Sequence, residues 1–371
     1  MKILSVFGTR PEAIKMAPIV RLLKQTAGVE ARVCVTAQHR QMLDQALELF
    51  GIKPDTDLDL MRDGQSLAQL SAGIFTRLDP VFEGFKPDWV LAVGDTTTVV
   101  TTSLLAFYRR IKFGHVEAGL RTHDKWHPFP EEINRRIATV TADLHFAPTE
   151  WSQGNLLREG VSRDRIHVTG NTVIDALNFV SKQNEPREIQ ELLEKLAVGK
   201  SGAKRLILVT AHRRENFGAP MEQICHALQQ LASRDDVEIV YPVHLNPNVQ
   251  EPVNRILKEA PHVTLLPPLD YLPLVHLMKH ASLILTDSGG IQEEAPAFGI
   301  PVLVMRETTE RPEGVDAGTL KLVGTETSRI VDEATRLLDD PAEHAKMAKA
   351  ANPYGDGHAA ERIVEALLKS A

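Results

Sequence analysis

The sequence has few of the residues on which several protein classes depend. Of its 371 residues only two are cysteine, and aromatic residues make up 5%. A disulfide-stapled secreted scaffold needs more cysteines, and base-stacking platforms for single-stranded nucleic acid need more aromatics. There is no basic excess either, because 42 Lys and Arg face 49 Asp and Glu and leave a net charge of −7. Nucleic-acid binding, which depends on a positive field, is therefore not expected.

Long hydrophobic runs are also missing. No stretch approaches the roughly 18 apolar residues of a membrane-spanning helix. The apolar start of the chain ends at Gly8, too early for a signal peptide. Cys34 lies in an apolar strand-like run and Cys225 in a helical pattern, and both thiols are expected to be buried and free. These features predict a soluble cytoplasmic protein with no membrane partner.

The chain does have a regular alternation of short apolar runs and helical patterns. Strands are predicted at 3–7, 31–36, 89–93, 112–116, 143–147 and 166–170, and again at 205–210, 237–243, 263–266, 282–286 and 301–305. Such alternation is typical of βα units around a parallel sheet. The length fits about two domains, and the polar stretch 182–204 separates the two series of strands. The sequence therefore predicts an α/β protein of two similar domains with a cleft between them.

Several short motifs that would indicate a cofactor or a metal fail on inspection. Residues 355–360 have the GxGxxA spacing of a dinucleotide site, but they follow Asn-Pro-Tyr rather than a strand. The segment GKS (199–201) resembles the end of a P-loop, but Glu194 stands where a P-loop needs its first glycine. The 14 histidines are scattered, and no HExxH or CxxC is present. No cofactor and no metal are predicted.

Polar and glycine-rich segments gather directly after the predicted strands. Ligands of open parallel sheets bind beyond the carboxyl ends of the strands. Five strand ends carry such loops, which read GTRPE (8–12), GDTTT (94–98), EAGLRT (117–122), HRREN (212–216) and DSGG (287–290). One loop of this kind could simply cap a helix, but five of them in two domains predict a binding site in the cleft.

Carboxylates are the first chemical feature of these loops. Asp95 and Glu117 end neighbouring predicted strands, and Glu131 and Glu132 follow the proline-bracketed HPFP loop (127–130). Several carboxylates at one site suit removal and return of a proton. The alternatives at this point are that Asp95 and Glu117 cap the following helices, and that Glu131 only stabilises a helix dipole.

Cations are the second feature, in a chain that is acidic overall. Ser288 and two glycines open a helix, and their backbone N–H groups could bind an anion, although Ser288 could equally be an ordinary N-cap. Glu294 on the same helix could bind a ribose or be merely solvated. Positive or imidazole side chains stand at the loop ends, namely Arg10, Lys15, His212, Arg213 and Arg311. Together they suit an anionic substrate such as a diphosphate, unless each belongs to a surface ion pair.

These loops resemble the motifs of the non-hydrolysing UDP-N-acetylglucosamine 2-epimerases. The matching stretches are FGTRPEAIKMAP, TAQHRQMLDQ, GDTTT, HVEAGLRT, FPEEINR, GNTVIDAL, HRRENFG, YPVHLNPNV, LTDSGGIQEEAP and TTERPE, and NPYGDG extends the match towards the C-terminus. The resemblance implies the GT-B fold, with two Rossmann-like domains whose parallel sheets face a central cleft. The domains are expected at 1–169 and 170–354, and a C-terminal helix at about 355–371 is expected to pack back on the first domain.

The resemblance also implies a reaction, the interconversion of UDP-N-acetylglucosamine and UDP-N-acetylmannosamine, which supplies a precursor for bacterial surface polysaccharide. The family eliminates UDP to give 2-acetamidoglucal, and UDP adds back after C2 is reprotonated on the other face. By motif, Asp95, Glu117 and Glu131 are the acid/base carboxylates, and His212 assists the departure and return of the diphosphate. A homodimer is implied as well, and neither a cofactor nor a metal is.

Binding residues follow from the resemblance in the same way. The motifs imply substrate contacts, chiefly to the nucleotide and its phosphates, by Arg10, Lys15, Asp95, Glu117, His212, Ser288, Gly289, Gly290, Glu294 and Arg311. The uracil lies against the segment matching PPLDYLPL (267–274), where Leu269 and Leu274 replace the Gln and Phe of some relatives. Some members bind a second, activating UDP-N-acetylglucosamine, and Gln38, Gln41 and Arg213 match that allosteric site.

Other functions compete with this interpretation. A GT-B glycosyltransferase would use the same UDP site but would have no evident use for three carboxylates at C2 of its donor sugar. A catalytically silent UDP-sugar sensor would not need these carboxylates together with His212. A hydrolysing epimerase would release UDP and free N-acetylmannosamine. An NAD-dependent epimerase would need a dinucleotide fingerprint where the chain has GTRPEA.

Overall fold

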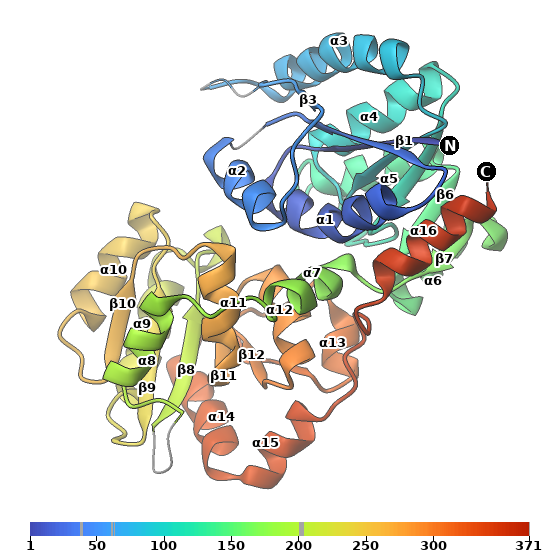
Figure 1. Ribbon diagram of the computed structural model, residues 1–371. Helices are drawn as coiled ribbons and strands as arrows, with labels where there is room; N and C mark the ends of the chain where they lie inside the picture. The colour runs from blue at the N-terminus through green and yellow to red at the C-terminus, as the bar shows by residue number, and fades with distance from the viewer. Residues whose placement is uncertain (38–39, 61, 63, 200–203, 371) are drawn as a thin grey trace. The chain divides into compact units, whose positions relative to one another are not determined.

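The chain forms two compact units, each built around its own sheet (Figure 1). The computed structural model describes residues 1–37, 40–60, 62, 64–199 and 204–370. Unit 1 comprises Met1–Asn178 and Tyr354–Ala371, and unit 2 comprises Phe179–Pro353. The chain therefore leaves unit 1 and later returns to it, so that its last helix belongs with the first half of the sequence.

The described residues of unit 1 form a seven-stranded parallel sheet with the strand order β3-β2-β1-β4-β5-β6-β7. The strands are β1 Lys2–Phe7, β2 Glu30–Val35, β3 Thr56–Asp57, β4 Trp89–Val93, β5 Lys112–Val116, β6 Leu144–Ala147 and β7 Ile166–Val168. β1, β4 and β5 are buried over almost their whole length. Their continuous apolar runs reflect a sheet that is covered on both faces.

Helices follow the strands of unit 1 along the chain. They are α1 Arg10–Gln25, α2 Arg40–Leu49, α3 Leu67–Phe85, α4 Thr97–Tyr108, α5 Glu131–Thr141, α6 Glu150–Arg158, the 3-10 turn η1 Arg163–Arg165, α7 Thr172–Val180 and α16 Ala359–Lys369. The final helix α16 packs against α1 (Figure 1). α1 begins with a capping box between Thr9 and Glu12, which fixes the turn after β1.

Unit 2 repeats this plan. Its described residues form a six-stranded parallel sheet ordered β10-β9-β8-β11-β12-β13. The strands are β8 Arg205–Thr210, β9 Val237–Pro242, β10 Val263–Leu266, β11 Ala281–Thr286, β12 Val302–Val304 and β13 Leu320–Leu322. The helices and 3-10 turns are α8 Arg187–Lys195, η2 Arg214–Asn216, α9 Ala219–Leu231, α10 Pro247–Leu257, α11 Tyr271–Lys279, α12 Gly289–Glu294, η3 Ala295–Phe298, α13 Pro312–Asp316, α14 Thr327–Asp339 and α15 Pro341–Ala348.

Each sheet has a switch point, where the strand order reverses. In unit 1 the chain runs outward from β1 to β2 and β3, and then returns to the other side of β1 with β4. In unit 2 it runs from β8 to β9 and β10, and returns beside β8 with β11. The loops after the two central strands of such a sheet lead to opposite sides. They leave a crevice at the carboxyl ends of the strands, where open α/β sheets bind their ligands.

Apolar side chains fill the space between each sheet and its helices. Val6 and Val90 of the first sheet pack with Phe82 of α3, and all three are fully or almost fully buried. In unit 2, Ile239 of β9 packs with Leu228 of α9 in a core of its own. Burying one such side chain contributes about 1.5–3 kcal/mol. The cores hold the sheets rigid, so the strand ends are fixed supports for the polar loops.

The strands predicted from the sequence are present, with ends that differ by no more than two residues. The sequence analysis does not predict β3 and β13, because two or three residues are too few to show an alternation. It also treats 182–204 only as a polar connection, whereas α8 lies there and buries Ile189 and Leu193, which are one helical turn apart.

The two cysteines are buried and free, as predicted. Burial raises the pKa of both thiols, Cys34 in β2 and Cys225 in α9, to about 12. Within the part of the chain that the structure describes, no helix is long and apolar enough to cross a membrane.

Candidate active site

The buried carboxylate of Glu12 joins the two loops at the switch point of unit 1. Its Oε2 accepts hydrogen bonds from the backbone N–H groups of Gly8 and Thr9, both at 2.8 Å. Its Oε1 accepts from the hydroxyl of Thr96, in the loop after β4, at 2.6 Å. Burial raises the pKa of Glu12 in spite of these bonds. We call Glu12 the bridging carboxylate of unit 1, because it ties the β1 loop to the β4 loop.

Asp95 lies beside Thr96 and is paired with α5. Its Oδ2 accepts from Nε and Nη2 of Arg135 at 2.9 and 2.7 Å. The side-chain amide of Asn134 donates to the backbone carbonyl of Asp95 at 2.8 Å. Thr96 occupies the N-cap position of α4. The interpretation of Asp95 as a cap is therefore wrong, since its side chain is bonded to a different helix.

Glu117 follows β5, the neighbour of β4, and has a left-handed backbone with a φ of +61°. A non-glycine residue in this region is uncommon and is often found at functional sites. Its Oε1 is ion-paired with Nζ of Lys15 on α1 and accepts from the side-chain amide of Asn171 at 3.1 Å. The next helix begins only at Glu131. Glu117 therefore does not cap that helix, and it is held by two donors from other parts of unit 1.

Two carboxylates open α5 and differ in their surroundings. Glu132 is fully buried and accepts from the backbone N–H groups of Thr122 and His123 at 3.0 and 3.2 Å. It also accepts from Arg135, the residue that binds Asp95. Glu131 is the first residue of α5, and its Oε2 is buried. A carboxylate in the first turn favours the helix dipole, so this role is compatible with the position of Glu131.

A buried imidazole is hydrogen-bonded to the loop that follows β4. His115 of β5 lies within 2.7 Å of the carbonyl oxygen of Gly94, the residue before Asp95, through its Nε2. Burial lowers the pKa of His115 to about 4. Its partner in the strand register, His145 of β6, is also buried and has its pKa lowered to about 3. Both rings are therefore neutral at pH 7, and Nε2 of His115 carries the hydrogen that it donates to Gly94.

Unit 2 has its own bridging carboxylate, Asp287, directly after β11. Its oxygens accept from the backbone N–H groups of His212 and Arg213, in the loop after β8, at 2.9 and 2.8 Å. They also accept from the side-chain amide of Asn216 at 3.0 Å, which in turn donates to the carbonyl of Met305. Asp287 is completely buried. It therefore ties the β8 and β11 loops together at the switch point of the second sheet.

The imidazole of His212 is oriented by two neighbours. Its Nδ1 lies 3.6 Å from Oδ1 of Asp287. Its ring stacks on that of His244, with centroids 5.3 Å apart and planes 14° apart. An imidazole held between a carboxylate and a second ring is suited to act on a phosphate group.

Gly289, the first residue of α12, lies beside the guanidinium of Arg311. A Cβ on Gly289 would come within 2.6 Å of Nη1 of Arg311, so glycine is needed for this close approach. Nε of Arg311 donates to the buried Glu293 at 2.7 Å, and this bond fixes the guanidinium over the start of the helix. Ser288 is the N-cap residue but makes no side-chain cap bond. The structure therefore places Ser288 at the N-cap position, as the alternative interpretation has it, but without a capping bond from its hydroxyl.

The remaining predicted residues fall into three groups. Arg10 is the first residue of α1 and half-buried, and Gly290 and Glu294 belong to α12. Leu269 and Leu274 are half-buried before and within α11. Of the predicted allosteric residues, Arg213 is half-buried and bound to Asp287 through its backbone N–H. Gln38 lies outside the described residues, and Gln41 is the second residue of α2, with a side chain that is likewise outside the description.

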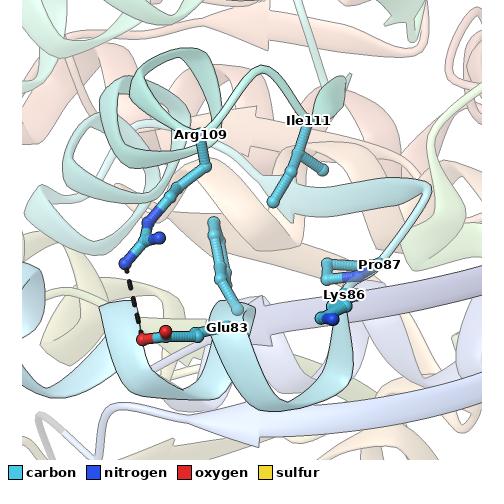
Figure 2. A pocket seen from close by; sticks show the side chains of 6 residues that line it. Glu83, Lys86, Pro87, Arg109 and Ile111 are labelled. Carbon is cyan, nitrogen blue, oxygen red and sulfur yellow. Dashed lines mark ion pairs between the residues drawn. The ribbon is translucent and has the colours of Figure 1, made fainter.

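A hollow of about 380 Å³ lies elsewhere on unit 1 (Figure 2). It is lined by the end of α3 and by the segments that lead into β4 and β5, namely Phe82, Glu83, Lys86, Pro87, Arg109 and Ile111. It therefore lies at the amino ends of these strands, opposite the candidate site. Arg109 is paired with Asp79 at 2.6 Å and with Glu83 at 3.9 Å. Charges that are already paired with each other do not identify a ligand for this hollow.

The structure adds residues that the sequence analysis does not assign to the site. They are the two bridging carboxylates Glu12 and Asp287, the partner of Asp95, Arg135, and the second donor to Glu117, Asn171. Asp287 has a sequence signal, because it follows a buried strand directly. Arg135 also has a sequence signal, because it follows Glu131 by four residues and so lies on the same face of a helix. The link between Asn171 and Glu117, 54 residues apart, has none in a single sequence.

Two Rossmann-like parallel sheets, each with polar loops at its switch point, define the GT-B class of two-unit α/β proteins, as the sequence predicts. The chain belongs to the UDP-N-acetylglucosamine 2-epimerase family, whose model matches residues 21–368.

Similar proteins agree over the full length. A UDP-N-acetylglucosamine 2-epimerase of Yersinia pestis is 59% identical over 99% of this chain and 98% of its own, and one of Escherichia coli K12 is 58% identical over the same shares. The crystal structure of UDP-GlcNAc 2-epimerase from Neisseria meningitidis bound to UDP-GlcNAc is 50% identical, with a TM-score of 0.91 and complete coverage of both chains. The enzyme from Methanocaldococcus jannaschii in complex with UDP-GlcNAc and UDP is 31% identical, with a TM-score of 0.81 and the same coverage.

Proposed function

We propose that the protein interconverts UDP-N-acetylglucosamine and UDP-N-acetylmannosamine by inverting C2 of the sugar. Membership of the epimerase family supports this proposal. The observation that carries it is the set of carboxylates in unit 1. Asp95 and Glu117 end adjacent strands, and Glu131 opens the helix whose Arg135 binds Asp95. Carboxylates placed together in this way suit removal and return of a proton.

The chemistry requires an indirect route, because no carbonyl adjoins C2 and its proton is not acidic. A carboxylate takes the C2 proton while the C1–O bond to UDP breaks, which yields 2-acetamidoglucal and UDP. A carboxylic acid then delivers a proton to the other face of C2 as UDP adds back to C1. We assign these transfers to Asp95, Glu117 and Glu131. A positioned acid/base group contributes about 10²–10⁴-fold to the rate of such a step.

Unit 2 supplies most of the contacts to UDP in this proposal. Arg311 and Ser288 bind phosphate oxygens, and His212 assists the departure and return of the diphosphate. The fixed guanidinium over Gly289 and the oriented imidazole support these roles. Further contacts to the same bound molecule are assigned to Arg10, Lys15, Gly290 and Glu294, and the uracil to the segment with Leu269 and Leu274. Unit 1 then carries the acid/base groups together with the contacts of Arg10 and Lys15, and unit 2 carries most of the nucleotide contacts.

The fate of the C2 hydrogen tests the proposal. UDP-N-acetylglucosamine is incubated with the enzyme in D2O, and the products are separated and examined by proton NMR and mass spectrometry. We expect UDP-N-acetylmannosamine to form and deuterium to enter C2 of both sugars, because the proton taken and the proton returned exchange with solvent. The variant Glu117→Gln serves as the control and should slow epimerisation and exchange together.

Each competing function gives a different result. Epimerisation with full retention of protium at C2 would contradict proton abstraction. Free N-acetylmannosamine as the product would indicate a hydrolysing enzyme. A glycosyltransferase would need an acceptor, and a sensor would produce neither epimer nor exchange.

We further propose that the protein is a homodimer. Phe107 and Tyr108 near the end of α4 are 63% and 65% exposed, and Val140 near the end of the neighbouring α5 is 86% exposed. Tyr108 also stacks on Phe75 of α3, with ring centroids 6.1 Å apart. Exposed apolar groups gathered on adjacent helices are typical of a protein interface. Light scattering should give twice the chain mass, and Val140→Asp should shift it towards the monomer.

The same ligand is proposed as an activator, bound by Gln38, Gln41 and Arg213. The backbone of Arg213 is anchored on Asp287 beside His212, so occupation of this site would act on the loop that carries the imidazole. The rate should then depend sigmoidally on UDP-N-acetylglucosamine, and Gln41→Ala should make the curve hyperbolic. Simple hyperbolic kinetics in the unmodified enzyme would contradict the activator and leave the epimerase proposal intact.

The proposed product is a precursor for surface polysaccharide, and we place the reaction in the cytoplasm. The two free, buried thiols are consistent with a reducing compartment.

A further inference from the structure

Asn171 lies where three parts of unit 1 meet. It is almost fully buried and immediately precedes α7. Its side-chain carbonyl accepts from the backbone N–H of Val173 at 3.0 Å, which makes it a cap of that helix. Its backbone N–H donates to the carbonyl of Tyr354 at 2.7 Å. Its side-chain amide donates to Oε1 of Glu117 at 3.1 Å. One residue therefore contacts the helix that leaves unit 1, the segment that returns to it and an acid/base carboxylate.

The returning segment holds the backbone around Asn171 in place. Gly170 and Gly355 both have positive φ angles, +86° and +127°, and a Cβ on Gly170 would lie 3.3 Å from the Cα of Gly355. The two segments thus pass each other backbone to backbone. Nη1 of Arg362 adds a bond to the carbonyl of Thr169 at 3.0 Å. The position of the Asn171 side chain is therefore fixed by the backbone on both sides.

The amide group is the part of Asn171 that capping does not explain. A helix cap needs an acceptor, which Ser or Asp would supply equally well. The amide donor is what asparagine adds, and this donor is bonded to Glu117. The charged and titratable groups around Glu117 include Lys15 on α1, Arg135 on α5 and His115 on β5, the strand that precedes Glu117. Asn171 is thus a neutral donor beside the ion pair with Lys15, on the same carboxylate oxygen.

We propose that Asn171 is a positioning residue that sets the orientation of the Glu117 carboxylate for proton transfer. This inference rests on the proposed epimerase function. Two donors on Oε1, one from α1 and one from the start of α7, restrict rotation of the carboxylate about its last bond. A hydrogen bond to the charged form also favours that form over the protonated one. Loss of the amide should therefore affect the transfer step and the pH dependence together, while nucleotide binding stays unchanged.

A double-mutant cycle tests whether Asn171 acts through Glu117. Asn171→Ser keeps a capping oxygen but removes the longer side-chain amide that reaches Glu117, and it should lower kcat about tenfold. KM for UDP-N-acetylglucosamine should stay within about twofold, because the lost interaction matters in the transition state. In the Glu117→Gln background, Asn171→Ser should cause no further loss of kcat. Effects that multiply would show that Asn171 acts independently of Glu117 and would overturn the inference.

A variant that introduces a charge tests the inference through the pH dependence of kcat/KM. If Asn171 had only a structural role, this pH dependence would not change. Asn171→Asp keeps the shape and the cap acceptor but places a second carboxylate against Glu117. The acidic limb of the kcat/KM profile should move to higher pH by roughly one unit, because like charges disfavour ionisation. The matched control is Asn155→Asp. Asn155 is equally buried and donates to the backbone carbonyl of Gly119 at 2.8 Å rather than to a carboxylate. A shift of the same size in this control would overturn the inference.

A spectroscopic measurement separates failure of this inference from failure of the proposed function. In protein labelled with ¹³C at the glutamate carboxyl groups, the Glu117 signal is identified by its loss in Glu117→Gln and followed during a pH titration. Its midpoint should rise in Asn171→Asp and remain in place in Asn155→Asp, whatever reaction the enzyme catalyses. An unchanged midpoint in Asn171→Asp would refute the link to Glu117, even if the enzyme proves to be an epimerase.

Discussion

In each of the two sheets one buried carboxylate ties the two switch-point loops together, but it comes from the β1 side in unit 1 and from the β11 side in unit 2. In unit 1 the bridging carboxylate is Glu12, on the helix after the first strand, and it reaches across to Thr96 in the β4 loop. In unit 2 it is Asp287, directly after β11, and it reaches back to the backbone of His212 and Arg213 in the β8 loop. The position of the carboxylate is therefore reversed, while the result, two loops tied together at the strand ends, is the same.

The side chains around the two bridging carboxylates, Glu12 and Asp287, are of different chemical types. Around Glu12, the loops carry further carboxylates, each held by a cation or an amide, as Asp95 is by Arg135. Around Asp287, the loops carry an imidazole stacked on a second one and, at the start of α12, a guanidinium beside Gly289. Carboxylates transfer protons, and imidazoles and guanidinium groups bind phosphate. In the proposed function the two similar folds carry separate parts of one reaction, and the following predictions test this division.

The largest effects are expected from substitutions that separate these two tasks. Asp95→Asn, Glu117→Gln and Glu131→Gln should each lower kcat by about 10²–10⁴-fold, because each removes a group that carries a proton. UDP binding should change little in these variants. Arg10→Ala and Ser288→Ala should instead weaken UDP binding. Steady-state kinetics and calorimetric titration with UDP give the two readouts.

One pattern of results would contradict the division between acid/base residues and UDP-binding residues. If the carboxylate variants lost UDP affinity as strongly as activity, then unit 1 would contribute to nucleotide binding through the same groups. Unchanged UDP affinity in both Arg10→Ala and Ser288→Ala would contradict the roles assigned to these two residues.

Much of this arrangement could be predicted from the sequence alone. Buried parallel strands are continuous apolar runs, so most strands were predictable, and with them the loops that bear Asp95, Glu117 and His212. The sequence also supports the assignment of the chain to its family, because long polar motifs follow those strands.

What the sequence could not show is which polar groups hold each other. Glu12 and Thr96 are 84 residues apart, and His212 and Asp287 are 75 apart. Such partners are brought together by the order of the strands in the sheet. A single sequence gives no information about that order. Short elements form a second limit, since β13 has too few residues to show a periodicity.

The second prediction concerns the bridging carboxylate of unit 2. Asp287→Asn places an amide where three N–H donors converge, so at least one buried donor loses its acceptor. The loss in the free energy of unfolding should be about 3 kcal/mol. The three tryptophans, Trp89, Trp126 and Trp151, all belong to unit 1. Tryptophan emission therefore reports unit 1 alone, and circular dichroism reports both units.

The comparison variant is Glu12→Gln in unit 1, and its effect should be smaller, about 1.5 kcal/mol. Burial already disfavours the charged form of Glu12, as its raised pKa shows, so a neutral amide removes part of that cost. Glu12→Gln should lower the transition followed by tryptophan emission. Asp287→Asn should lower the transition followed by circular dichroism and leave the emission midpoint in place. Parallel shifts of both signals in both variants would show that the bridges do not act locally.

The smallest effect is expected from acid, through the paired histidines inside the first sheet. The folded-state pKa of His115 is about 4, below its ordinary value of 6.5. Between these two pH values the unfolded chain binds a proton that the folded chain does not, so stability falls as the pH decreases through this window. From pH 7 to pH 5.5 the loss should be about 1 kcal/mol for this residue. His115→Gln retains a donor for Gly94 but cannot titrate. Urea unfolding followed by tryptophan emission should therefore show a weaker dependence on pH in this variant, with the remainder due to His145. An equal loss of stability in the variant and in the unmodified protein would contradict the assignment, and would show that other groups cause the acid sensitivity of unit 1.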